Sequence, residues 1–311
     1  MRQISLHNRA VIMMVLSATI ISTSGLFIRN LETATAWQVV FWRGLSLAVA
    51  ILGFQAYTHR RATFTQFKRV GRLGVFGGLF LSGGLIGYVL AITNTTVANA
   101  TFTMSAIPLF TAVLAWLVLG ERVSLTTVAA IATAVGGIAL MVGDGIATGT
   151  ALGNFMALFT AVCLACFVVI LRKGRAVDML PATSIGATFS VIIAAYMMGG
   201  SPAPLLRDVA LCLILGGLIA GSGHVLFVSA SRALLGAELS LLALIEFILG
   251  PIWVWAFINE TPSPMTLFGG SLVLAAVGGH AALSLLRPNE AAGADTQMHE
   301  AGLSIGPTIN N

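Results

Sequence analysis

The chain contains an internal duplication. Residues 77–91 and 98–124 match residues 216–230 and 237–263 at a constant offset of 139, without a gap. Identical residues recur along both segments, as in the pairs Gly77/Gly216, Gly78/Gly217, Leu79/Leu218, Gly84/Gly223, Val89/Val228, Ala91/Ala230, Ala98/Ala237, Trp116/Trp255, Glu121/Glu260 and Ser124/Ser263. A sequence copied in this way must fold into two halves built from the same elements.

Composition places both halves in a membrane. Hydrophobic residues make up 57% of the chain, charged residues only 9%, and the mean hydropathy is +0.96. A soluble domain carries about 25% charged residues, so the chain is predicted to be an integral membrane protein whose main partner is the lipid bilayer. The net charge of +5 does not indicate nucleic-acid binding, because the basic residues lie in short loops between apolar runs.

Ten apolar stretches are each near the roughly 20 residues that cross about 30 Å of hydrocarbon. The predicted spans are 10–28, 37–57, 72–92, 97–119, 125–143, 151–171, 181–199, 209–230, 238–258 and 265–286. The first is interpreted as a retained helix and not a signal peptide, because it is long and no small-residue cleavage site follows it. The polar tail, 288–311, is predicted to be disordered.

The basic residues predict the orientation of these spans. If residues 1–9 are cytoplasmic, 13 of the 16 Lys and Arg residues fall in cytoplasmic segments, Arg29 and Arg207 fall outside, and Arg43 lies within a span. Such a bias follows the positive-inside rule and predicts cytoplasmic N- and C-termini.

Each copy of the duplication contains five spans, so the second copy is predicted to be inverted relative to the first. The fold class expected is an all-α membrane protein with ten transmembrane helices in two inverted five-helix repeats, 10–143 and 144–287. Inverted repeats place the substrate site of many secondary transporters near the bilayer midplane, where either side gains access in turn. One such chain suffices for a monomeric pathway, and a homodimer is the alternative.

Two segments resemble a known family. Ile107-Pro108 through Trp116 to Glu121, and Leu244-Ile-Glu246 through Trp255 to Glu260, resemble the EamA-type transporters of the drug/metabolite transporter superfamily. The resemblance implies a ten-helix exporter of small metabolites in a bacterial-type inner membrane, with neutral or aromatic amino acids or drugs as cargo. The second half departs from the pattern because Phe247, not a proline, follows Glu246, and Pro251 comes four residues later.

Four ionisable residues lie inside predicted spans, where each needs a partner or a water-filled cavity: Arg43, His224, Glu246 and His280. Glu246 precedes Pro251, which frees a backbone carbonyl, so its carboxylate either binds a substrate amino group or a proton, or fixes packing. Arg43 either binds a substrate carboxylate or pairs with Glu246. His224 either couples transport to protons or is a neutral residue of the bundle, and for His280 the structural role is favoured.

Other residues are candidates for the wall of a substrate site. Asn99, Thr101 and Ser105 bring amides and hydroxyls to the fourth span. Tyr88 is matched in the second copy by Phe227, so the two rings form either a central aromatic pair or ordinary core.

Several function classes are excluded or disfavoured. No H-E-x-x-H, Walker A or G-x-S-x-G motif is present, so an intramembrane enzyme is the weaker alternative to transport. Cys163 and Cys166 lack a second cysteine pair or a histidine at metal-site spacing. No metal or cofactor is therefore expected, and a multidrug or other metabolite exporter remains the closer alternative.

Overall fold

The computed structural model describes residues 6–60, 63–119, 124–174, 177–201 and 204–286, and within these ranges it contains helices and no strand. Some residues used in the sequence analysis lie outside the described ranges. They are Glu121 of the repeated motif, the tail 288–311, and the basic residues Arg2, Arg61, Arg122, Arg175 and Arg287. Ten segments of the described chain are long and apolar enough to cross a membrane. The prediction of an all-α protein with ten spans is therefore confirmed.

Seven spans are single helices and three are composite. The single helices are α3 (Ala36–His59), α4 (Thr63–Asn94), α7 (Leu125–Thr148), α8 (Ala151–Lys173), α9 (Leu180–Met198), α12 (Gly236–Ile258) and α13 (Pro264–Leu286). The composite spans are α1 (Leu6–Ser22) with α2 (Ser24–Arg29), α5 (Val97–Met104) with α6 (Ile107–Leu119), and α10 (Leu206–Leu213) with the π-helix η2 (Ile214–Ala220) and α11 (Gly221–Ala230).

Local chemistry explains where helices begin. The hydroxyls of Thr35, Thr96 and Ser124 each accept a hydrogen bond from the backbone N–H three residues later, at the starts of α3, α5 and α7. Such N-caps satisfy donors that the first turn of a helix leaves free. Each of these residues therefore marks where its helix starts.

The interruptions also have local causes. The fourth span breaks between Met104 and Ile107, directly before Pro108, which lacks a backbone N–H and is placed in the first turn of α6. The first span breaks at Thr23, whose hydroxyl donates to the carbonyl of Ile20 at 2.7 Å. The third span, α4, begins at Thr63, nine residues before the predicted start at residue 72. It kinks at Gly71, where φ is +49°.

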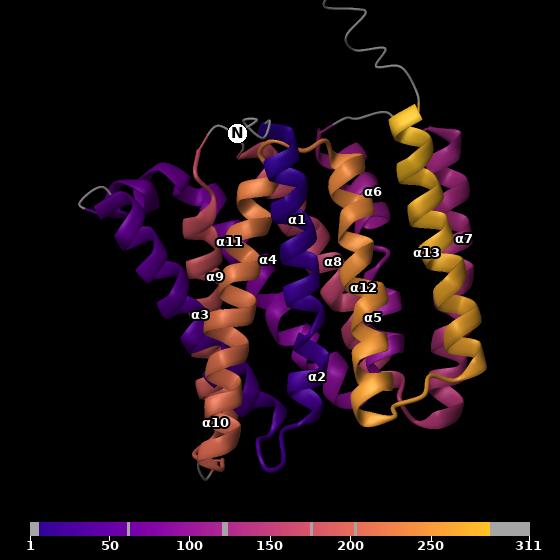
Figure 1. The fold of residues 1–311 in the computed structure, drawn as a ribbon, viewed down its shortest axis with the longest axis horizontal. Helices are drawn as coiled ribbons and strands as arrows, with labels where there is room; N and C mark the ends of the chain where they lie inside the picture. Colours follow the sequence, from indigo (N-terminus) through magenta and orange to yellow (C-terminus); the bar gives the residue numbers. More distant parts are fainter. Residues whose placement is uncertain (1–5, 61–62, 120–123, 175–176, 202–203, 287–311) are drawn as a thin grey trace, which may run out of the picture.

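The helices form a bundle in which the two halves interleave (Figure 1). The third span, α4, packs on α8 and α9, which are the first two spans of the second half. Its counterpart in the second half, the eighth span, packs on the first two spans of the first half, through α11 on α1 and through η2 on α3. Helix α3 packs on α9, and α7 packs on α13. These pairings are compatible with the predicted inverted repeat, which remains a prediction.

Both described ends of the chain lie at one end of the bundle, drawn at the top of Figure 1. We call this the proximal end; it carries the ends of α3 and α8 and the start of α12. The opposite, distal end carries the connections after α2, α4 and α12. Arg29 and Arg207, the two basic residues predicted to be extracellular, belong to helices that end or begin at the distal end.

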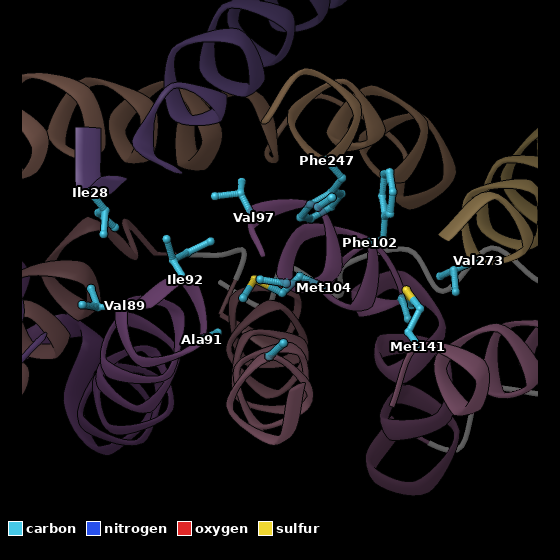
Figure 2. Close-up of a cluster of buried hydrophobic side chains, with 14 of the residues drawn as sticks. Ile28, Val89, Ala91, Ile92, Val97, Phe102, Met104, Met141, Phe247 and Val273 are labelled. Atoms are coloured by element: carbon cyan, nitrogen blue, oxygen red, sulfur yellow. The ribbon is translucent and has the colours of Figure 1, made fainter. Parts of the chain in front are cut away.

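A large apolar cluster, part of which is drawn in Figure 2, includes Ile28 at the end of α2, Ile92 near the end of α4 and Val97 at the start of α5. Val89, Ile92 and Val97 are fully buried there. These distal side chains pack tightly and leave no room for a solute between them. Met104 and Phe247 of the same cluster line an internal cavity, which extends toward the other end.

Candidate functional site

A cavity of about 600 Å³ lies between the helices and reaches the proximal end. Its deep part is lined by Arg43 of α3, Tyr88 of α4 and Glu246 of α12. Toward the proximal end its walls include Ser124, Arg172, Arg232, Ser240 and Ser284. Because α3, α4, α8, α11 and α12 all contribute, both halves of the chain form the cavity.

Arg43 occupies the deep part of the cavity. Its side chain is 6% exposed, and its Nε atom has no hydrogen-bond partner within the described chain. The guanidinium carbon lies 5.4 Å from the centre of the Tyr88 ring, a cation–π arrangement. A buried guanidinium with an unsatisfied N–H is costly unless an anion completes it, so the geometry suits a carboxylate on a bound molecule.

The opposite wall carries Glu246, in the middle of α12 and five residues before the internal Pro251. Glu246 lines the same cavity as Arg43, yet among the described residues no ion pair within 4.0 Å joins the two side chains. The cavity therefore presents one basic and one acidic side chain that do not contact each other directly.

Close packing between α3 and the π-helix η2 fixes the backbone of Arg43. A Cβ atom at Gly216 would lie only 1.9 Å from the carbonyl oxygen of Arg43 and 2.1 Å from the hydroxyl of Ser46. The Ser46 hydroxyl donates to the carbonyls of Arg43 and Cys212, at 3.1 and 3.4 Å. A π-helical turn is often found at functional sites, and here it lies directly behind Arg43.

His224 and Phe227 line the same cavity from α11. The Nδ1 atom of His224 lies 2.8 Å from the carbonyl oxygen of Ala220. Because a carbonyl only accepts, this contact places a proton on Nδ1 and leaves Nε2 available to the cavity. His280 also lines the cavity, from α13.

Three predicted wall residues are not among those lining the cavity. The hydroxyl of Thr101 donates to the carbonyl of Val97 at 2.8 Å, and that of Ser105 to the carbonyl of Phe102 at 2.7 Å. The Nδ2 atom of Asn99 donates to Oδ1 of Asn154 at 2.6 Å. Their hydrogen bonds are made within the protein.

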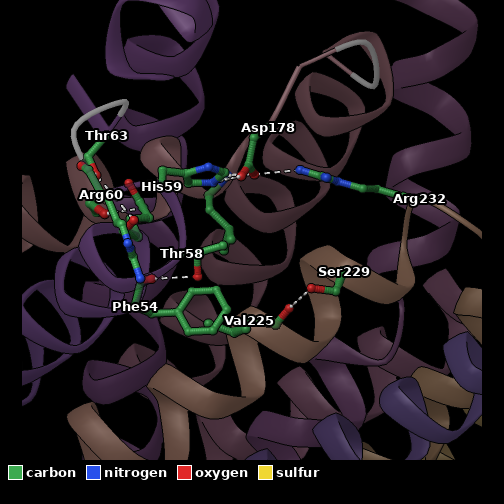
Figure 3. Close-up of polar contacts among 12 residues, drawn as sticks. Phe54, Thr58, His59, Arg60, Thr63, Asp178, Val225, Ser229 and Arg232 are labelled. Atoms are coloured by element: carbon green, nitrogen blue, oxygen red, sulfur yellow. Dashed lines mark hydrogen bonds and ion pairs between the residues drawn. The ribbon is translucent and has the colours of Figure 1, made fainter. Parts of the chain in front are cut away.

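Asp178 organises the proximal mouth of the cavity (Figure 3). Its carboxylate lies between two basic side chains, 3.1 Å from Nε2 of His59 and 2.6 Å from Nη2 of Arg232. It also accepts a hydrogen bond from the backbone N–H of Leu180 at 3.1 Å. Asp178 thus links the ends of α3 and α11 to the connection between α8 and α9.

Some cavity residues were not singled out from the sequence. Met104, Pro108 and Thr111 line one wall, and Phe247 lies beside Glu246. Met104 ends α5, whereas Pro108 and Thr111 lie in α6 beyond the break in the fourth span, so a regular helical spacing could not have grouped them. Pro108 itself was the available signal in the sequence.

These features define a multi-pass helical membrane protein with an internal cavity that both halves line. Residues 8–143 match the EamA-like transporter family, which confirms the resemblance predicted from the sequence. The chain is 26% identical over 282 residues to solute carrier family 35 member G1 of Mus musculus, covering 85% of this chain and 76% of the relative. It is 24% identical over 277 residues to the Homo sapiens protein of the same name, with coverages of 84% and 75%.

A solved crystal structure of another protein has the same fold. It superposes with a TM-score of 0.65 over 90% of this chain and 99% of that chain, at 16% sequence identity. The matched family is a family of transporters, and both relatives are named as solute carriers. They agree with a transporter and give no support to an enzyme.

Proposed function

We propose that the protein is a secondary transporter that exports small metabolites, such as neutral or aromatic amino acids, by alternating access. The solute binds between the two halves, in the deep part of the cavity. The observation that carries this proposal is the pair formed by Arg43 and Glu246, a basic and an acidic side chain that line one cavity without direct contact.

The charge pair suits a zwitterion. Arg43 binds the carboxylate of the solute through its guanidinium N–H groups, one of which has no partner within the described chain. The Glu246 carboxylate accepts a hydrogen bond from the ammonium group of the solute. Each charged group of the protein gains a partner when the solute binds, and this offsets the loss of hydration of the solute.

The other walls suit an apolar or aromatic side chain. Tyr88, Phe227 and Phe247 lie around the two charged groups, and Leu81 and Leu85 continue the apolar surface along α4. Aromatic pockets contribute both area and ring stacking to a bound aromatic ring. A volume of about 600 Å³ accommodates a solute of this size together with water.

The proposed orientation places the proximal end in the cytoplasm of a bacterial-type inner membrane. The lysines and arginines of the described chain gather at that end, except Arg43 in the deep part of the cavity and Arg29 and Arg207 at the distal end. In this orientation the cavity is open to the cytoplasm, as an exporter requires for loading. One chain lines the whole cavity, which supports a pathway within a monomer, whether or not two copies associate.

Proton coupling is the second part of the proposal. Glu246 and His224 both line the cavity and both exchange protons. If Glu246 releases or binds its proton during each cycle, then an imposed pH gradient accelerates transport. No cofactor or metal is required for this cycle.

The proposal is tested by counterflow. The purified protein is reconstituted in liposomes loaded with unlabelled neutral or aromatic amino acid, and uptake of the labelled compound is followed with and without a pH gradient. The matched control is Glu32→Gln, because Glu32 forms an exposed ion pair with Arg207 away from the cavity.

The expected result is saturable counterflow whose half-saturation concentration rises about 10- to 100-fold in Arg43→Gln and stays unchanged in Glu32→Gln. Absence of counterflow for every amino acid tested overturns the amino-acid cargo and leaves another metabolite or a drug as the exported compound. Flux that does not saturate indicates a channel and overturns alternating access.

A further inference from the structure

A polar cluster joins three segments of the chain at the distal end. The Nε atom of Arg29 lies 2.8 Å from Oε2 of Glu260. Nη2 of Arg29 donates to the carbonyl of Thr95 at 2.6 Å, and the backbone N–H of Val97 donates to Oε1 of Glu260 at 2.6 Å. The Arg29 and Glu260 side chains are 26% and 17% exposed, so water reaches both only partly.

This cluster connects the two halves. Arg29 ends α2 and Val97 begins α5, both in the first half, whereas Glu260 follows α12 in the second half. The Glu260 carboxylate binds the first N–H of α5, where the helix dipole favours a negative charge. Separation of α2 and α5 from α12 at the distal end must break these contacts.

The seam behind the cluster leads to the cavity. Val97, Thr101 and Met104 lie along one face of α5. Val97 touches the cluster through its N–H, Thr101 is buried next to α12 with its methyl group 3.3 Å from the Cβ position of Gly250, and Met104 lines the cavity. A path from the cavity to the distal surface along this face would pass Thr101 and end at Glu260.

We infer that Arg29 and Glu260 form the latch that closes the distal end of the transport pathway while the cavity is open at the proximal end. When the solute moves to the distal side, the ion pair separates and the seam between α5 and α12 opens. This inference rests on the proposed alternating access but not on the nature of the cargo.

The expected effect follows from the exposure of the pair. Loss of a partly exposed ion pair changes an equilibrium by a factor of about five, and loss of a hydrogen bond to a charged group by somewhat more. Glu260→Gln keeps an oxygen that accepts from Val97 and removes the charge opposite Arg29. We expect it to shift the ratio of the two states toward the distal-open one by about five- to tenfold.

The experiment uses cysteine accessibility in nanodiscs, where a maleimide reaches both ends. Cys163, Cys166 and Cys212 are replaced by alanine, and a single cysteine is introduced at Thr101, which is 5% exposed, or at Ser240, which lines the cavity. Labelling rates are measured in the parent, in Glu260→Gln and in the matched control Glu32→Gln. The control removes a carboxylate from an exposed ion pair at the same end.

The latch predicts changes of opposite sign. In Glu260→Gln, labelling at position 101 rises about five- to tenfold and labelling at position 240 falls, while Glu32→Gln changes neither. An unchanged rate at position 101 overturns the inference, and so does a rise at both positions, which indicates general loosening. If Glu260→Gln does not fold, Arg29→Gln provides the same test. Because no solute is added, a failed amino-acid counterflow leaves the result intact.

Discussion

Substitution of Gly216 by alanine tests whether close packing behind Arg43 holds the site in place. The new Cβ atom would lie 1.9 Å from the Arg43 carbonyl oxygen, where contacts below 3.0 Å are essentially never seen, so η2 and α3 must move apart by about 1 Å. Overpacking of this kind costs about 1 to 3 kcal/mol. We expect the apparent unfolding midpoint to fall by several degrees.

The adjacent Gly217 supplies the control. A Cβ atom there would lie 3.6 Å from Cβ of Ser46, an ordinary contact. Gly217→Ala is therefore expected to leave the midpoint unchanged or to raise it slightly, because alanine favours a helix over glycine by up to about 1 kcal/mol.

The assay combines thermal unfolding in detergent with the half-saturation concentration for counterflow. In Gly216→Ala the displaced Arg43 weakens solute binding, and a loss of about 1.4 kcal/mol raises the half-saturation concentration tenfold. If both variants unfold at the parent temperature and transport equally well, then the contact between η2 and Arg43 does not position the site, and the reasoning is wrong.

Further predictions concern three acidic or basic side chains. Glu246→Gln is expected to abolish stimulation by a pH gradient and to raise the half-saturation concentration for amino acids, while exchange persists at saturating solute. Unchanged pH dependence in the flux assay rejects proton transfer by Glu246. Arg43→Gln is expected to raise the half-saturation concentration for carboxylate solutes by about 10- to 100-fold, measured against the same solutes as methyl esters, for which the change should be small. Asp208 is 0% exposed and accepts hydrogen bonds from the backbone N–H groups of residues 32–34 at 2.7 to 3.2 Å. Asp208→Asn is therefore expected to lower the free energy of unfolding, measured by denaturation, by about 2 to 3 kcal/mol. An unchanged free energy of unfolding would show that these hydrogen bonds do not stabilise the fold.

Hydropathy predicted the spans well because the bilayer imposes one length and one kind of surface on every crossing segment. It did not predict the interruptions, because these depend on short-range hydrogen bonds and on packing. Pro108 was a local signal for the break in the fourth span. The π-helix η2 had no such signal, because its packing against the backbone of α3 depends on a contact between residues that are far apart in the sequence.

Some residues of the candidate site could be predicted from the sequence and others could not. Arg43 and Glu246 were predictable because a charged side chain in a span cannot satisfy itself on its own helix and must find a cavity or a partner. Thr101 and Ser105 differ, because a hydroxyl can donate to a carbonyl of the preceding turn and remain buried in packing. The distal cluster was not predicted, since Arg29 and Glu260 are far apart in sequence and meet only through the fold.

Alternating access is tested most directly by distance measurements between spin labels at the two ends. One label pair spans the distal end, at Asn30 and Thr261, and another spans the proximal end, at Thr58 and Leu235; all four side chains are exposed. On adding a transported solute, the account predicts a population in which the distal distance lengthens while the proximal distance shortens. Distances that remain fixed, or that change in the same direction at both ends, contradict it.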